Sequence, residues 1–313
     1  MRHKKADDVS GWLVVDKPCG IGSTTVVGKT RWLMHANKNG HTGTLDPFAS
    51  GVLPIAFGEA TKLVPFVTDG KKEYEFVLKF GEQTSTDDTE GEVVARSDKI
   101  PTHDEIMAVL PNFMGRIKQV PPIYSAIKIN GQQAYKLARR GQEVEMPARE
   151  VEIYALELLE EYADSAKFRV ECSKGTYVRT LGKDLALKLG TVGHLTALRR
   201  TKCGIFTLKD TILLDYLEKM EYVEERRKSL LPMETSLRDI AEIAVSAEDA
   251  LKLMHGQSLS PKGFAVLPET NLAAAKFENC LIALVRIDER KITPFRVFNL
   301  NNLKKETKDV DNK

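Results

Sequence analysis

The sequence has few residues of the kinds that build metal and disulfide sites. Its 313 residues include only four cysteines and six histidines. The cysteines are far apart and form no CxxC pair: Cys19, Cys172, Cys203 and Cys280. Structural zinc sites need clustered ligands, so the sequence predicts none, and scattered free thiols are typical of a reducing compartment.

Long apolar segments are also missing. No apolar run approaches the roughly 20 residues that a membrane-spanning helix needs. The N-terminal stretch MRHKKADDVS is basic and then acidic, and it lacks the apolar core of a secretory signal. We therefore expect a cytoplasmic protein with no membrane partner.

The net charge is only +2, and such a small positive excess by itself argues against a nucleic-acid partner. Basic residues nevertheless gather in two local clusters: Lys136, Arg139 and Arg140, and Arg199, Arg200 and Lys202. Such clusters either follow the phosphates of a nucleic acid or are ordinary solvated surface. The sequence alone leaves both interpretations open.

The composition, 42% hydrophobic and 29% charged residues, is that of a globular protein. Strand and helix patterns are intermixed without regular alternation, which predicts an α+β fold. The clearest strand is 74–80, where Tyr74 and every second residue after it are apolar. Other predicted strands are 12–15, 52–58, 149–159, 166–172 and parts of 195–207. The predicted helices are 23–34, a second helix that begins at a Thr102/Glu105 capping box, and 177–189.

A domain boundary is expected near Leu231-Pro232-Met233, which would give a large domain over 10–232. Residues 240–303 predict a small, mostly β module, with a short helix capped by Ser246 and strand-like runs around 265–266, 280–285 and 296–298. The charged tail 304–313 is expected to be disordered.

A glycine-containing stretch near the N-terminus approximates a phosphate-binding P-loop but has the wrong spacing. Five residues separate Gly22 from Gly28-Lys29-Thr30, where the motif has four. Val26 and Val27 also fit a helix core better than a phosphate cradle. The sequence therefore argues against nucleotide hydrolysis.

The stretch from His41 to Leu53 holds the strongest candidate for a reacting group. Asp46 precedes Pro47, which restricts its backbone to extended conformations, and Gly43 and Gly51 allow tight paths on either side. A surface turn in which Asp46 bonds its own backbone is the ordinary outcome for Asp-Pro. The alternative is a rigid loop that presents a carboxylate to a substrate.

Four segments resemble the motifs of the TruB family of tRNA pseudouridine synthases, and they stand in the family's order. They are Asp16-Lys17-Pro18 with Gly20 and Ser23, Gly40-His41 through Leu53, Lys72-Glu73-Tyr74, and Gly175 through Leu181 followed by 193–195 and 198–201. The similarity is strong over residues 10–210 and looser towards the C-terminus. It favours the functional interpretation of Asp46.

The resemblance implies a catalytic domain with a mixed, mainly antiparallel sheet, and a C-terminal PUA-like RNA-binding module. It implies an isomerase that converts uridine-55 in the TΨC loop of tRNA into pseudouridine by flipping out the base, without cofactor or metal. The tRNA TΨC stem-loop would be the partner of a monomer that needs no other protein. The alternative is a non-catalytic tRNA-binding or tRNA-folding module on the same scaffold.

By the same resemblance, Asp46 is the catalytic nucleophile and Arg179 its partner. A guanidinium can bind a carboxylate in a forked geometry and keep it ionised when buried, so we expect such a contact here. Whether Asp46 attacks the uracil ring or acts through the sugar stays open.

The resemblance also assigns residues to the substrate pocket. Tyr74 would stack on the target base and relay a proton, and Tyr177 would bring a second hydroxyl close to the substrate. Leu198 would form an apolar wall, and His41 would fill the space left by the flipped nucleotide. From periodicity alone, Tyr74 and Leu198 are equally suited to the core.

Overall fold

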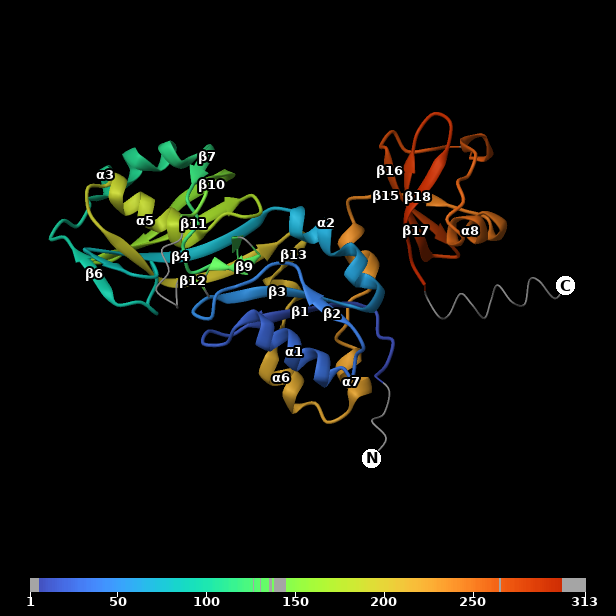
Figure 1. Cartoon of the computed structure of the whole chain (residues 1–313), viewed down its shortest axis with the longest axis horizontal. Coiled ribbons are helices and arrows are strands. Elements are labelled where there is room, and N and C mark those ends of the chain that lie inside the picture. The colour runs from blue at the N-terminus through green and yellow to red at the C-terminus, as the bar shows by residue number, and fades with distance from the viewer. Residues whose placement is uncertain are drawn as a thin grey trace.

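The structure, a computed structural model, describes residues 6–125, 127–129, 131–134, 137, 145–264 and 266–299. It contains a large body built on a ten-stranded sheet and a small body built on a four-stranded sheet, which form two lobes in Figure 1. The predicted basic cluster Lys136, Arg139 and Arg140 and the predicted tail 304–313 lie outside the described residues.

The ten-stranded sheet is mixed and mainly antiparallel, as predicted. Its spatial order is β14-β1-β3-β12-β4-β11-β10-β7, with β2 also paired to β3 and β13 to β12. Only the pairs β1–β14 and β3–β12 are parallel. The strands are β1 Gly11–Lys17, β2 Asn39–His41, β3 Ser50–Phe57, β4 Lys72–Phe80, β7 Gly115–Gln119, β10 Arg149–Glu161, β11 Ser165–Cys172, β12 Gly193–Cys203, β13 Phe206–Thr207 and β14 Ile212–Leu213.

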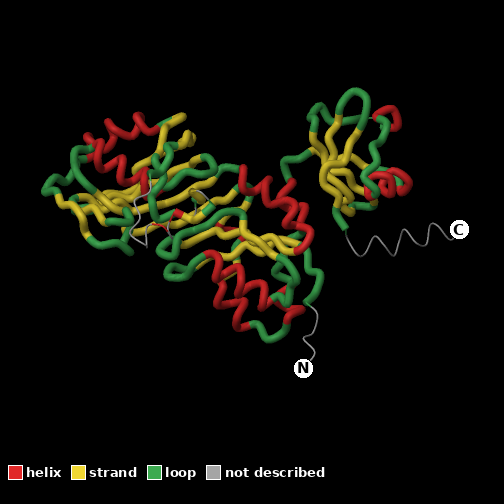
Figure 2. Tube along the Cα trace, in the orientation of Figure 1, coloured by secondary structure: helices red, strands yellow, loops and turns green. Residues whose placement is uncertain are grey.

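Helices flank this sheet, as the red segments outside the yellow strands show in Figure 2. They are α1 Ser23–Leu33, α2 Val64–Asp69, α3 His103–Val109, α5 Val178–Lys188, α6 Leu214–Lys219 and α7 Val223–Arg227, with 3-10 turns at Gly58–Leu63, Leu110–Phe113, Leu208–Asp210 and Met233–Leu237. Two short hairpins complete the body: β5 Glu82–Thr84 with β6 Val93–Arg96, and β8 Lys128–Ile129 with β9 Gln132–Gln133. The predicted capping box is present, because Thr102 and Glu105 exchange hydrogen bonds at the start of α3.

The core of the large body follows from the alternation of β4. Phe76, Leu78 and Phe80 are buried on one face, each contributing about 1.5–3 kcal/mol by leaving water. Helix α5 packs on this face, and it comes so close to β12 that a Cβ at Gly182 would lie 2.6 Å from Leu195. This close packing fixes the start of α5 relative to the sheet.

The small body contains β15 Ala241–Ala244, β16 Leu272–Phe277, β17 Cys280–Ile287 and β18 Ile292–Val297, with α8 Ala247–Met254 and a 3-10 turn at Pro261–Gly263. Ser246 caps α8 as predicted. The predicted strand at 265–266 is wrong for Val266, which is exposed outside any strand, while Ala265 lies outside the described residues. The sheet instead uses Leu272–Phe277, whose alanines give a weak strand signal.

The two bodies share a packed contact. Phe298 and Leu281 of the small body are buried in one cluster with Leu63 and Met233 of the large body. Lys62 Nζ donates to the carbonyl of Val297 at 2.7 Å. In the described part of the chain, no helix is both long and apolar enough to span a membrane.

Candidate active site

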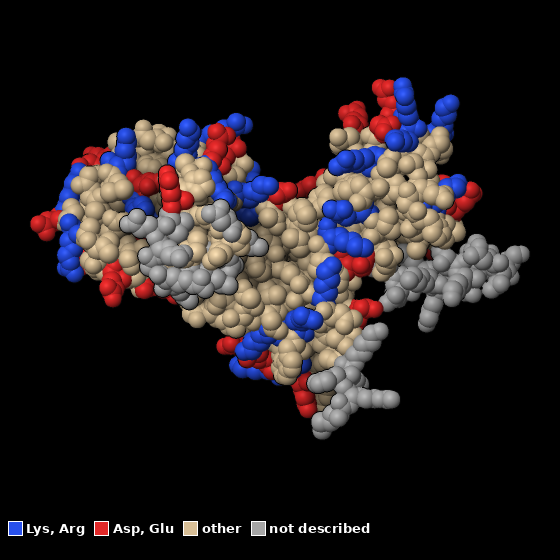
Figure 3. Space-filling model, viewed as in Figure 1, with Lys and Arg blue, Asp and Glu red and all other residues tan. Residues whose placement is uncertain are grey.

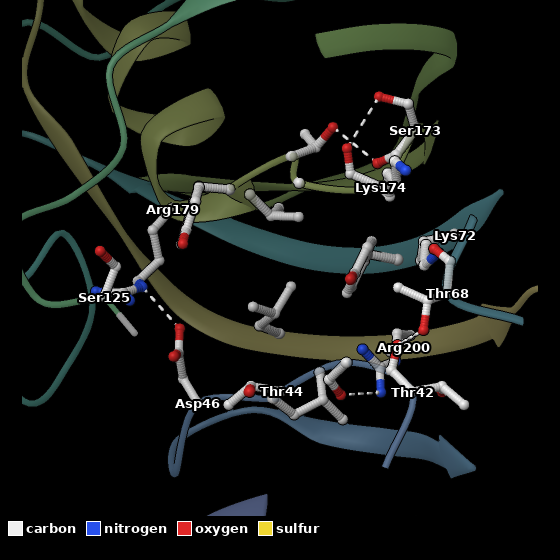
Figure 4. Close-up of a pocket in the computed structure, with 18 residues that line it drawn as sticks. Thr42, Thr44, Asp46, Thr68, Lys72, Ser125, Ser173, Lys174, Arg179 and Arg200 are labelled. Carbon is white, nitrogen blue, oxygen red and sulfur yellow. Dashed lines mark hydrogen bonds and ion pairs between the residues drawn. The ribbon is translucent and has the colours of Figure 1, made fainter. Parts of the chain in front are cut away.

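A cavity of about 250 Å³ opens in the large body where β4 and β12 face the loop after β2 and the start of α5. Figure 4 shows Asp46 and Arg179 at one end, and Thr42, Thr68, Lys72 and Arg200 at the other. The cavity therefore has an end with a carboxylate and an end rich in donors.

The loop that carries Asp46 is anchored through its neighbours. Ser23 Oγ donates to the carbonyl of Leu45 at 2.8 Å and also receives the Leu45 N–H at 2.8 Å. The Gly20 N–H donates to the carbonyl of Pro47 at 2.8 Å. The Asp46 side chain, 33% exposed, faces Arg179 across the cavity mouth. The structure therefore agrees with a rigid loop that presents the Asp46 carboxylate, and not with a simple surface turn.

Arg179 contacts Asp46 through one nitrogen only. Its Nε lies 2.9 Å from Asp46 Oδ2, although the N–H is not well directed at any acceptor in the described structure. Nη1 and Nη2 donate instead to the carbonyls of Thr86 and Tyr124, both at 2.9 Å. The expected forked contact is therefore wrong, because backbone acceptors occupy the other arms of the guanidinium.

A second carboxylate, Asp88, belongs to this cluster and was not predicted. Its Oδ2 lies 3.4 Å from Arg179 Nη1, and both side chains are almost fully buried. The Glu90 N–H donates to Asp88 Oδ1 at 2.9 Å. No motif in the sequence marks this residue, and the doubled acid Asp87-Asp88 is its one sign.

The electrostatics of Asp46 reflect these neighbours. Burial raises the pKa of the Asp46 carboxyl above its ordinary value, Arg179 opposes that rise, and the charge of Asp88 adds to it. The carboxylate is accessible at the cavity mouth yet is less stable as an anion than in water. Such a group is more basic and more nucleophilic than a solvated one.

Tyr74, Tyr177 and Leu198, which the resemblance assigns to the substrate pocket, all line the cavity. Burial raises the pKa of Tyr74 to about 12, against the opposing effect of Arg200. At neutral pH the Tyr74 hydroxyl is therefore protonated and can donate. Tyr177 is pinned by Gln119, which accepts from its N–H at 2.8 Å and donates to its carbonyl at 3.0 Å.

His41 lies apart from the other predicted pocket residues. It lines an adjoining hollow of about 760 Å³, which Asp46 and Arg179 also border. Its Nδ1 accepts from the Gly43 N–H at 3.2 Å. Burial lowers the pKa of His41, and Arg200 lowers it further, which favours the neutral ring.

The predicted basic cluster at Arg199, Arg200 and Lys202 does not form a free surface patch. Arg199 binds both carboxylate oxygens of Asp16, at 2.7 and 3.1 Å. Arg200 is only 1% exposed and so cannot grip an RNA backbone. Basic side chains gather instead at the junction of the two bodies in Figure 3, where Lys38, Lys62 and Arg296 line a hollow.

Among the described residues, no group of three or more His, Cys, Asp or Glu side chains is arranged to hold a metal ion. The side chains of the site are carboxylates, phenols and guanidiniums, which can carry out general acid–base and nucleophilic chemistry.

Two family models match the chain. Residues 31–178 match the N-terminal domain of the TruB family pseudouridylate synthases, and residues 179–238 match the C-terminal domain of tRNA pseudouridylate synthase B. The chain belongs to the TruB family. The two matches end before β15, so they do not cover the small body of this TruB-family protein.

Curated relatives match this chain over nearly its whole length. "tRNA pseudouridine synthase B" of Caulobacter vibrioides is 45% identical over 96% of this chain and 99% of its own. The Bradyrhizobium diazoefficiens protein of the same name is 47% identical, over 95% of this chain and 88% of its own. A solved structure described as an H/ACA RNP bound to a substrate RNA containing 2'-deoxyuridine has a TM-score of 0.69 and 25% identity, covering 93% of this chain and 86% of its own.

Proposed function

We propose that this TruB-family protein converts uridine-55 in the TΨC loop of tRNA into pseudouridine. The observation that carries the proposal is the carboxylate of Asp46, held 2.9 Å from Arg179 at the mouth of a cavity that Tyr74 and Leu198 also line. The curated relatives named tRNA pseudouridine synthase B support tRNA as the substrate.

The reaction is an isomerisation and needs no co-reactant. The N1–C1′ bond of the target uridine breaks, the base turns, a C5–C1′ bond forms, and the proton lost from C5 is balanced by one gained at N1. Asp46 acts as the nucleophile, and Arg179 holds it ionised and aimed into the cavity. Tyr74, protonated at neutral pH, lies against the base, with Leu198 as the apolar wall and Tyr177 as a second hydroxyl near the substrate.

Binding requires that the target nucleotide leave its loop. His41, neutral and in the hollow next to Asp46, fills the place of the flipped nucleotide by stacking. Lys136, Arg139 and Arg140 remain candidates for phosphate contacts. We assign catalysis to residues 10–232 and additional RNA binding to a PUA-like module at 240–303, in a cytoplasmic monomer that needs no other protein.

The test is to incubate the protein with an unmodified tRNA transcript, without added metal or nucleotide, and to map pseudouridine by position. Modification at position 55 is expected. Asp46→Asn should remove turnover and leave tRNA binding intact, because the amide keeps the shape but is not a nucleophile. Asp164→Asn, at an exposed turn between β10 and β11, is the matched control and should stay active.

Two results would contradict the proposal. Turnover near the wild-type rate in Asp46→Asn would remove its catalytic role. Tight tRNA binding by the wild-type protein with no pseudouridine at any position would favour the non-catalytic tRNA-folding alternative.

A further inference from the structure

Arg200 forms the buried floor of the cavity at the end away from Asp46. It follows Leu198 by two residues on β12, so both side chains lie on the same face of the sheet. In the sheet register Arg200 lies opposite Tyr74 on β4 and opposite Gly51 on β3. An arginine thus occupies the centre of the sheet, directly beside the tyrosine proposed to contact the base.

The guanidinium has neutral partners only. Its Nε donates to the carbonyl of Val52 at 2.8 Å, and Nη2 donates to the carbonyl of Gly43 at 3.2 Å. Its positive charge also opposes the rise in the pKa of the neighbouring Tyr74 hydroxyl. Among the described residues, no carboxylate lies within 4.0 Å of it, whereas the adjacent Arg199 pairs with Asp16.

The other cations that line the cavity are already occupied. Arg179 faces both Asp46 and Asp88. Lys174 pairs with Asp69 at 2.8 Å. Lys72 Nζ also has no carboxylate partner, but the carbonyls of Val67, Thr68 and Gly70 take all three of its donors, whereas Arg200 uses only Nε and Nη2 on carbonyls. Of the two arginines that line the cavity in the described structure, Arg200 is therefore the one with no carboxylate within 4.0 Å of its guanidinium.

An uncompensated buried cation costs free energy, and a negative charge that arrives beside it during function offsets that cost. The proposed reaction supplies such a charge by either chemical path. If the N1–C1′ bond breaks first, its electron pair stays on the base and spreads over N1, O2 and O4. If Asp46 adds to C6 first, the C5–C6 electron pair moves towards O4. In both cases the ring carries a negative charge while C1′ passes from N1 to C5, and afterwards the proton lost from C5 is balanced by one gained at N1.

We propose that Arg200, together with the hydroxyl of Tyr74 on the neighbouring strand, stabilises the negative charge on the uracil ring during the rearrangement. This role rests on the proposed function. It makes Arg200 a catalytic residue rather than a phosphate-gripping one, and it divides the cavity by task. Asp46 and Arg179 act at the side of the glycosidic bond, and Tyr74 and Arg200 act at the ring oxygens.

The test compares two tRNAs, one with uridine and one with 5-fluorouridine at the target position, under single-turnover conditions. Fluorine withdraws electrons and stabilises the ring anion, so the fluorinated base depends less on a positive charge in the protein. The rate measured is the loss of the target nucleoside, and the quantity compared is the ratio of the 5-fluorouridine rate to the uridine rate. Variants are Arg200→Gln and Arg200→Lys, with Arg169→Gln as the control, since Arg169 pairs with Glu157 elsewhere on the same sheet.

Arg200→Gln should slow the uridine reaction by about 100-fold or more, the usual cost of removing one preorganised stabilising donor, and should slow the 5-fluorouridine reaction by less than about 10-fold. The ratio should therefore rise at least about tenfold, while Arg169→Gln leaves it unchanged. In Arg200→Lys, the ratio of the 5-fluorouridine rate to the uridine rate should rise with pH more than in wild type. Burial lowers the pKa of a lysine, so the lysine loses its charge as the pH rises, whereas an arginine stays charged.

A purely structural role for Arg200 predicts different results. Both substrates would then slow by the same factor in Arg200→Gln, and the ratio in Arg200→Lys would follow wild type at every pH; either outcome would overturn the inference. If Arg200→Gln does not fold, the pH series of Arg200→Lys decides. Wild-type protein that fails on the uridine tRNA would instead refute the proposed function itself.

Discussion

Arg179→Lys keeps a positive charge beside Asp46 but removes a planar group that serves several acceptors at once. In the structure the guanidinium donates to the carbonyls of Thr86 and Tyr124 and faces the carboxylates of Asp46 and Asp88. These four acceptors surround it in different directions. A single ammonium on a flexible stem cannot reach all of them, so this substitution is not conservative.

The size of the effect follows from the two backbone hydrogen bonds that a lysine leaves unmade. A buried carbonyl deprived of its donor costs about 1–3 kcal/mol, so without the bonds to Thr86 and Tyr124 the protein should be destabilised by about 2–6 kcal/mol. At about 2 °C per kcal/mol, the melting temperature should fall by about 4–12 °C. Asp46 is also left without the partner that aims it, and a misplacement of about 1 Å is enough to lower the single-turnover rate about 100-fold.

The measurements are thermal unfolding and single-turnover pseudouridine formation with saturating protein. Arg226→Lys is the matched control, because Arg226 also donates to three backbone carbonyls, those of Leu217, Leu33 and Met220, away from the cavity. It should lose stability but keep the chemical rate. This account of the site would be refuted by an Arg179→Lys protein whose free energy of unfolding is within about 1 kcal/mol of wild type and which retains a tenth or more of the single-turnover rate.

Three further predictions follow from the same geometry. Asp88→Asn removes a charge that raises the pKa of Asp46, so the acidic limb of the kcat/KM profile should move to lower pH, and a move to higher pH would contradict the cluster. Tyr74→Leu should lower kcat while leaving the salt dependence of tRNA binding unchanged, because stacking on a base releases no counterions; an altered salt slope would count against the pocket role. Gly51→Ala should destabilise the protein by more than about 2 kcal/mol in thermal unfolding, since φ is +104° and the new Cβ would lie 2.2 Å from the Arg200 carbonyl oxygen; an unchanged melting temperature would show that the strand shifts freely.

Local patterns predicted most of the large body. The strand at 74–80 and the helix from Ser23 are present because their apolar residues recur with the period of each element. The strands Ala241–Ala244 and Leu272–Phe277 were missed because alanine packs in strands only when neighbouring strands supply the burial. That information lies in the tertiary structure and not in the segment.

The site was predictable where side chains carry a motif and unpredictable where the backbone does the binding. Asp46 and Arg179 are indeed brought together, as the resemblance implied. The carbonyls of Thr86 and Tyr124 have no signature in the sequence, so the true partners of the guanidinium could not be foreseen. The basic run predicts Arg200 at the surface because it adjoins Arg199, which is wrong, although the two-residue spacing from Leu198 indicates a side chain that points into the protein.

The position of β12 has a consequence for how the chain acquires its shape during synthesis. β3 and β4 follow one another in the sequence, yet β12, made much later, lies between them in the sheet. Until Cys203 has emerged from the ribosome, the start of β3 and one edge of β4 have unpaired backbone groups, and long-range pairing of this kind is slow. A chain that terminates before β12 therefore presents open edges prone to aggregation, and no smaller working version of the protein can arise from its N-terminal half.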